Sequence, residues 1–314
     1  MVEANTTHRD LIAQYEGYQD VNGERFAILP KGGFIQIFTK LARSNVAQDV
    51  ATATASLDTL SLEEIRQKTK EFCEKYFTLH NINSISMQKM QELISSMTAS
   101  STDEAISIIN SAVTEISPLD IDIDLVPGEP MVGQVVKPLP ITPDIVKHPD
   151  RKMYFSHVEM GEQLTSLSVG TLIHEIAHME QESNIGYAKN LVNREVISIF
   201  LEKVYAYEAD PSGELLKLSE KTRMIDVLIK YTALLKPLTT QYDKNEALTY
   251  IKSTLAAEKL FDMYLNERKQ KNKDKYFKDI QAVFDGQMTV EELLTSRNIT
   301  NANIQDLGML QRHI

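Results

Sequence analysis

The chain of 314 residues is poor in cysteine and in positive charge, and it contains no long apolar run. Its single cysteine, Cys73, cannot form an internal disulfide, which excludes a fold built on disulfides. A formal net charge of −11 argues against binding nucleic acid or anionic membranes, since both need basic patches. The N-terminus lacks the basic and apolar regions of a Sec signal, and no stretch approaches 18 apolar residues. We therefore expect no nucleic-acid or membrane partner, and a location in the cytoplasm or export without a Sec signal peptide.

Prolines concentrate in one part of the chain. Seven of the ten fall between residues 118 and 149. Because proline lacks an amide donor and fixes φ, this segment is predicted to be extended, with short strands at 121–126 and 132–136. The chain is thus predicted to have three parts: an N-terminal lobe over 1–117, this connector over 118–150, and a second lobe over 151–314.

Both lobes are predicted to be mostly helical. Apolar residues recur at three-to-four spacing over 36–114, where "SLEE" and "STDE" supply N-caps and Cys73 is expected in the core. In the second lobe a strand is expected over 152–161. It is followed by helices over 163–182, 189–209, 212–235, 238–270 and 273–285. The expected fold class is therefore mostly α (α+β), with a small sheet.

The stretch "TLIHEIAHMEQE", residues 171–182, contains two histidines four positions apart, with a glutamate directly after the first. On a helix these positions share one face, so His174 and His178 can direct imidazole nitrogens at one metal ion. Glu175 lies beside them, where a general base can deprotonate a metal-bound water. Small and apolar residues in the preceding "SLSVGTLI" predict that the helix is otherwise buried. The motif predicts a Zn²⁺ site with His174 and His178 as ligands and Glu175 as base.

A catalytic zinc ion needs a third protein ligand, and the next histidine after His178 is His313. A carboxylate is therefore expected from "NREVISIFLEKVYAYEAD", residues 193–210. Its acidic side chains are Glu195, Glu202, Glu208 and Asp210. Glu195 is preferred, because 17 positions after His178 allow one helix to end and an antiparallel one to begin. Ser198 and Glu202 share its face, and Glu202 is expected to accept a hydrogen bond from a ligand imidazole.

These motifs resemble the gluzincin metallopeptidases. Within that group, "EVISIFLE" (195–202) is similar to the E-x-x-S-x-x-x-E signature of the thimet oligopeptidase and oligopeptidase F family. "KMYFSHVEMGEQLTSLSVGTLIHEIAHMEQ" resembles that family's edge strand and zinc helix. The resemblance covers roughly residues 152–210, about a fifth of the chain. It implies a zincin-like fold with the sheet beside the H-E-x-x-H helix, and zinc bound by His174, His178 and Glu195. It also implies an edge strand near Tyr154–Val158 that pairs with substrate, through residues such as Tyr154 and His157.

The chain departs from this family in several ways. It is far shorter, and the C-terminal His/Gly/Tyr-rich motif that steadies the family's transition state is missing. The thermolysin-type E-x-x-x-D is also incomplete, because Ile199 stands in place of the aspartate. A tyrosine hydroxyl is therefore expected to stabilise the oxyanion, with Tyr242 or Tyr250 preferred. The alternatives are Tyr187, Tyr205, Tyr231 and Tyr264.

The predicted function is a zinc-dependent metallopeptidase that hydrolyses a peptide or protein substrate through a zinc-activated water, with Glu175 as general base. One alternative is a non-catalytic binding protein that keeps the zincin fold, suggested by the missing C-terminal motif. Another is a dedicated protease, such as an effector or toxin, that acts on one protein.

Overall fold

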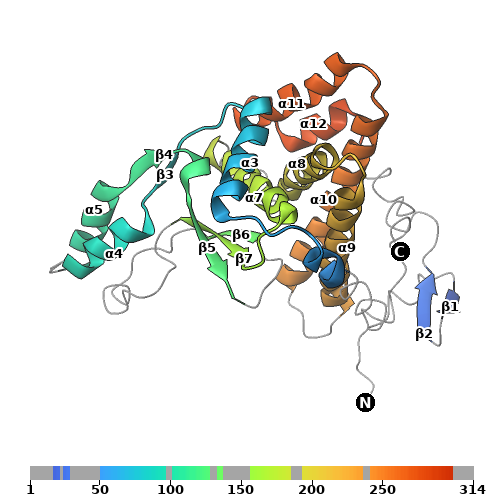
Figure 1. The fold of residues 1–314 in the computed structure, drawn as a ribbon, viewed down its shortest axis with the longest axis horizontal. Helices are drawn as coiled ribbons and strands as arrows, with labels where there is room; N and C mark the ends of the chain where they lie inside the picture. The colour runs from blue at the N-terminus through green and yellow to red at the C-terminus, as the bar shows by residue number, and fades with distance from the viewer. Residues whose placement is uncertain are drawn as a thin grey trace. The chain divides into compact units, whose positions relative to one another are not determined.

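The computed structural model describes residues 17–21, 24–28, 50–96, 101–127, 133–136, 156–184, 193–235 and 241–299. The fold is mostly helical with a small sheet, as predicted (Figure 1). It divides into two compact units. We call Thr59–Asn184 the sheet unit, and Ile185–Ile314 together with Met1–Asp58 the helical unit. None of the helices in these described ranges has the length and hydropathy needed to cross a membrane.

The sheet unit is built around three strands. β7 (His157–Gly161) lies in the centre, parallel to β5 (Asp122–Val126) and antiparallel to β6 (Gly133–Val136). Helix α7 (Ser166–Asn184) packs against β6, β7 and α3 (Leu62–Tyr76). Thus β5 and β6 come from the proline-rich connector, and the residue range of each agrees within one residue with the strand predicted there.

The two faces of this sheet differ in chemistry. A Cβ built on Gly133 would lie 2.1 Å from Thr171 Cγ2, so the face to which Gly133 belongs is the one covered by α7. Alternation and register place Val158 and Met160, both buried, on this same face. The opposite face carries mostly polar side chains, namely Asp122, Asp124, Gln134, His157 and Glu159. We call this second side the acidic face.

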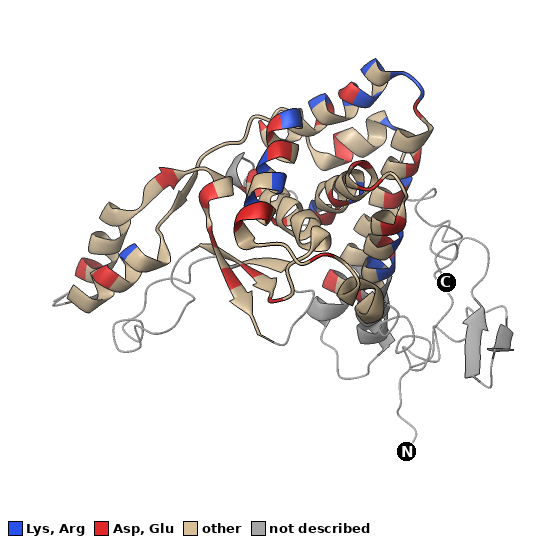
Figure 2. Ribbon diagram, viewed as in Figure 1, with Lys and Arg blue, Asp and Glu red and all other residues tan. Residues whose placement is uncertain are grey.

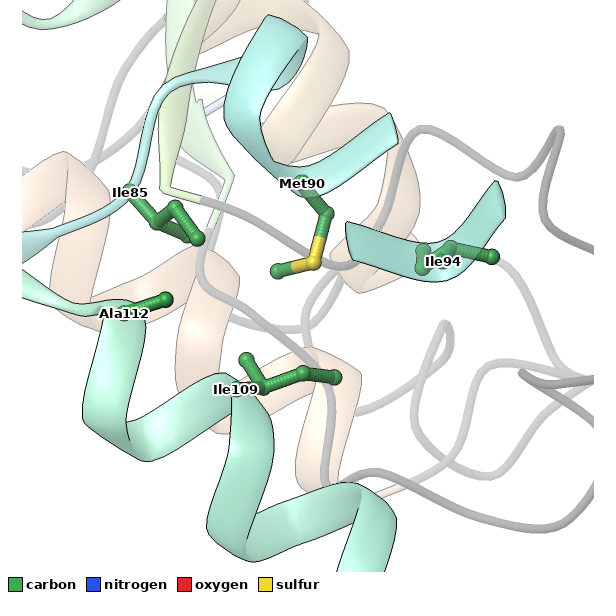
Figure 3. Packing of buried hydrophobic residues seen from close by; sticks show 5 residues of the cluster. All are labelled: Ile85, Met90, Ile94, Ile109 and Ala112. Carbon is green, nitrogen blue, oxygen red and sulfur yellow. The ribbon is translucent and has the colours of Figure 1, made fainter. Parts of the chain in front are cut away.

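A smaller part of the sheet unit is a helical hairpin on two short strands. Strands β3 (Ile82–Ser84) and β4 (Thr114–Ile116) pair antiparallel and flank α4 (Met87–Ser96) and α5 (Thr102–Ala112). Its core is the cluster in Figure 3, formed by Ile85, Met90, Ile94, Ile109 and Ala112. The carboxylate of Asp122 accepts a hydrogen bond of 2.6 Å from the Met87 amide, which ties the start of α4 to β5.

The described part of the helical unit contains five helices and a hairpin, besides the helical residues 50–55. The helices are α8 (Arg194–Ala209), α9 (Glu214–Leu235), α10 (Gln241–Asn266), α11 (Gln270–Phe284) and α12 (Val290–Ser296), and the hairpin pairs β1 (Gly17–Val21) with β2 (Glu24–Ile28). Helix α8 packs against α9, α10 and α12. Between α8, α9 and α10, the buried Lys203 ammonium lies 2.6 Å from Glu258 and 2.9 Å from Glu220. Burial alone would lower the pKa of Lys203, but these two carboxylates outweigh it and raise the pKa, so the charge is retained.

Most expected helices are confirmed, and so are the N-caps at Ser61 and Ser101. The edge-strand prediction is wrong, because β5 and β6 pair on either side of β7 and make it the central strand. The two units also differ from the three predicted parts, since pairing with β7 joins the connector strands to the H-E-x-x-H helix.

Cys73 gives a direct probe of the sheet unit. Its thiol lies in the core, as expected, and burial, together with the negative charges of Glu180 and Glu74, raises its pKa to about 12. The thiolate, which is the nucleophile, is therefore scarce at pH 8. We expect iodoacetamide to leave the folded chain unmodified at pH 8 and to label it stoichiometrically in denaturant, as read by mass spectrometry. Rapid labelling of the folded chain would contradict this packing.

Gly133 is required by the close approach of β6 to α7. Gly133→Ala places a methyl group against Thr171 Cγ2, so we expect a loss of about 1–3 kcal/mol in the free energy of unfolding. Thr171→Ser removes the opposing methyl group and keeps the hydroxyl that donates to Leu167 O. The double variant should therefore recover most of the lost stability in urea denaturation. A Gly133→Ala chain as stable as the wild type would refute the contact.

Candidate metal centre

Helix α7 holds the two motif histidines inside the sheet unit. Its apolar positions are buried, among them Val169, Leu172, Ile173, Ile176 and Ala177. His174 is also buried, with 6% of its surface exposed, while His178 is half-buried. One turn of helix separates them, so the rings meet edge to face with centroids 4.7 Å apart. The two imidazoles thus approach each other on one side of the helix.

The nitrogen positions fit a shared metal ion. His174 Nε2 and His178 Nε2 are 3.0 Å apart. Two nitrogens bound to one tetrahedral Zn²⁺ at its usual bond length lie about 3.4 Å apart, so only a small opening of the pair is needed. A neutral imidazole donates from one nitrogen and accepts at the other, so the same separation also suits one hydrogen bond between the rings. The donor set and its spacing are therefore compatible with a shared zinc ion and equally with a single hydrogen bond between the rings.

Glu175 is held beside the histidines by the edge strand. It is buried, with 5% of its surface exposed, and its Oε2 accepts a hydrogen bond of 3.0 Å from the backbone amide of Val135. Because that amide points at Glu175, it is directed away from β7, toward the outer edge of β6. The predicted base is thus held by a backbone donor of β6, which ends the order of the three-stranded sheet.

Among the described residues of the sheet unit, the histidine pair has no third residue with which to form a three-ligand group. The predicted third ligand, Glu195, belongs to the helical unit. It lies in the first turn of α8, where a carboxylate is favoured by the helix dipole. Glu195 is 8% exposed, and its Oε1 accepts a hydrogen bond of 3.2 Å from Arg194 Nε.

Glu202 belongs to a buried polar network in the helical unit. Its Oε1 accepts a hydrogen bond of 2.9 Å from Ser219, and its Oε2 accepts one from Arg223. Arg223 also donates to the Tyr250 hydroxyl over 2.6 Å. Ser198, fully buried, lies near its helical neighbour Arg194, with 3.5 Å between Ser198 Oγ and Arg194 O. Both Glu202 oxygens are thus engaged by donors of the same unit.

The Tyr250 hydroxyl lies near the predicted ligand as well as Arg223. Burial raises the pKa of Tyr250, and the negative charges of Asp226 and Glu195 add to the increase, while Arg223 opposes it. The phenol therefore stays protonated and serves as a donor, here toward Asp226 Oδ2 at 3.4 Å. Glu195, Glu202 and Tyr250, chosen separately from the sequence, are thus linked within one part of the helical unit.

The other tyrosines considered as oxyanion donors either lie in packed surroundings or are outside the described residues. Tyr205 is buried, which raises its pKa to about 12, and Tyr264 lies in an aromatic cluster with Phe200 and Phe261. The side chains of Tyr242 and Tyr231, and all of Tyr187 and Tyr154, are outside the described residues. His157 is fully buried on the acidic face, away from α7, so the structure does not bring it to the histidine pair.

Several residues at these sites escaped the sequence reasoning. The roles of the Val135 amide and of Gly133 could not be recognised, because neither a backbone donor nor a missing side chain can be read from the residue types. Arg223 is another such residue, because one arginine in a long helix does not stand out. Glu180 on α7 is fully buried and holds the His80 amide and ring, at 3.0 Å and 2.8 Å. A glutamate two positions after the motif was a visible but unspecific signal.

Comparison with known proteins adds no assignment to this geometry. No protein-family model matches the chain, and neither a curated protein nor a solved structure matches it.

Proposed function

We propose that this chain is a zinc-dependent metallopeptidase with a zincin-like arrangement, which hydrolyses peptide bonds in a peptide or protein substrate. The observation that carries the proposal is the convergence of His174 Nε2 and His178 Nε2 to 3.0 Å, with Glu175 fixed beside them by Val135. A hydrogen-bonding interaction between the two rings alone would not explain a glutamate anchored next to them. We further propose Glu195 as the third ligand, on the strength of its sequence position.

The zinc ion would supply Lewis-acid activation of water and of the scissile carbonyl. Proton transfer and substrate binding would be carried out by residues of the chain. Glu175 takes the proton from the attacking water and passes it to the leaving amine. Since β6 is an edge strand beside Glu175, an extended substrate is proposed to pair with β6 and not with β7. The substrate strand would then compete with Glu175 for the Val135 amide and release the carboxylate for proton transfer.

The Tyr250 hydroxyl is the proposed donor to the oxyanion. It is protonated and held by Arg223, which also binds Glu202. An oxyanion donor must be oriented before the reaction, because its contribution depends on costing no reorganisation. A hydroxyl fixed by a guanidinium meets that requirement, and Asp226 is the acceptor from which it would turn to the oxyanion.

The metal site is tested by its stoichiometry. By mass spectrometry of the purified protein, we expect His178→Ala and Glu195→Ala each to contain one zinc ion per chain fewer than the wild type. Glu208→Gln, a half-buried carboxylate on the same helix as Glu195, serves as the matched control and should keep its zinc. A zinc content in His178→Ala equal to that of the wild type would refute the ligand set. A zinc content in Glu195→Ala equal to that of the wild type would mean that another residue is the third ligand, with Glu202 the next candidate.

The catalytic role is tested by Glu175→Gln, which preserves shape and removes the base. Zinc should remain, and the rate of peptide hydrolysis should fall by about 10²–10⁴-fold, the usual contribution of a general base. Activity is measured with a mixed library of quenched fluorescent peptides and by labelling new N-termini in a lysate. Glu162→Gln, an exposed position between β7 and α7, is the control.

The cleavage pattern separates the enzyme from its alternatives. Many short products indicate a general peptidase, and one cleaved protein indicates a dedicated protease. A wild-type chain that holds zinc but yields no new N-termini over the Glu175→Gln background would instead be a binding protein. Retained cleavage in Glu175→Gln would rule out the proposed mechanism.

A further inference from the structure

The acidic face of the sheet has a second group of side chains suited to a metal ion. His157 and Glu159 alternate along β7, and Asp124 on β5 lies beside Glu159 in the register of the parallel pair. One ligand atom from each, a ring nitrogen and two carboxylate oxygens, lies within 4.8 Å of the others. These three side chains point away from α7, so they are separate from the histidine pair of the H-E-x-x-H motif.

The geometry within this group is that of converging ligands. His157 is fully buried, and its Nε2 lies 3.6 Å from Glu159 Oε1. That separation is longer than a hydrogen bond and close to the spacing of about 3.4 Å between two ligands of one tetrahedral zinc ion. The other oxygen, Glu159 Oε2, accepts a hydrogen bond of 2.6 Å from Gln134 Nε2 on β6. Ligating carboxylates are commonly oriented by such a partner.

The charges of the strands also favour a cation here. The carboxylates of Asp124 and Glu159 lie on neighbouring strands, where like charges are destabilising. Strands β5 and β7 contain acidic residues, and none of the strands β5, β6 and β7 contains lysine or arginine (Figure 2). The nearby Asp122 carboxylate is already engaged by the Met87 amide. A bound cation would convert repulsion between two half-buried carboxylates into attraction to a common centre.

We propose that Asp124, His157 and Glu159 bind a second divalent transition-metal ion, of the Zn²⁺ or Mn²⁺ class. One imidazole with two carboxylates suits these ions, whereas Ca²⁺ and Mg²⁺ take oxygen ligands. The ion would link β5 to β7 and so stabilise the sheet that presents β6 to α7. Its role is structural, because its ligands lie on the face of the sheet opposite Glu175.

The test is made in the full-length His178→Ala chain, so that metal at the H-E-x-x-H motif does not contribute. The protein is equilibrated with Zn²⁺ and, separately, with Mn²⁺, freed of unbound metal by gel filtration, and analysed by mass spectrometry. We expect one equivalent of Zn²⁺ or Mn²⁺ per chain. Asp124→Asn and Glu159→Gln, added to His178→Ala, should each remove it, because they keep the shape of the side chain and delete its charge. A failure of the proposed peptidase activity would leave this result unchanged.

A matched control and a stability measurement complete the experiment. Glu115→Gln, an exposed carboxylate on β4, should retain the ion. Chelation should lower the thermal midpoint of His178→Ala by several degrees and leave that of His178→Ala/Asp124→Asn unchanged, since an ion that binds only the folded state stabilises it. Absence of metal from His178→Ala after equilibration with both ions would overturn the proposal. Equal metal content in the parent and in both carboxylate variants would overturn it as well.

Discussion

The hydrogen bond from the Val135 amide to Glu175 is the interaction on which the candidate site depends. It brings an edge strand to the H-E-x-x-H helix, and it requires Gly133, whose missing side chain lets the strand approach Thr171. The bond also satisfies part of a buried carboxylate, which would otherwise lose its hydration without compensation. One contact thus joins the packing of the sheet unit to the position of the proposed base.

The sequence predicted local structure well, because local structure follows from local patterns. Apolar spacing and N-caps located α3, α5 and the helices from α7 to α11, but not α12, and extended segments between prolines located β5 and β6. The order of the strands in the sheet was not predictable, because strand pairing joins residues that are far apart in the sequence. The proline-rich segment was also interpreted as a connector between two lobes. The resemblance to a family with an edge strand before its zinc helix predicted that β7 lies at the edge of the sheet. In the structure β7 lies between the two connector strands.

In the candidate site, too, some residues could be recognised from the sequence and their partners could not. His174, Glu175 and His178 could be found because the chemistry requires those residue types at that helical spacing. Glu202 and Tyr250 were chosen for their type, but what holds them could not be foreseen. Arg223 donates to both, and no pattern in α9 singles it out. The energetic reason for this network is the cost of a buried carboxylate, which is reduced only by donors that the fold brings together from separate helices.

The alternation of β7 suggests how one short strand can serve two purposes. Val158 and Met160 lie on the face that α7 covers, so they support the helix that carries the histidine pair. His157 and Glu159 lie on the other face, where they meet Asp124 and Gln134. Because the two faces differ by a single residue step, a register shift of one position would exchange them and destroy both. A cation on the acidic face would oppose such a shift between β5 and β7, so the proposed structural ion would act on the candidate active site by fixing the register of the sheet beneath it.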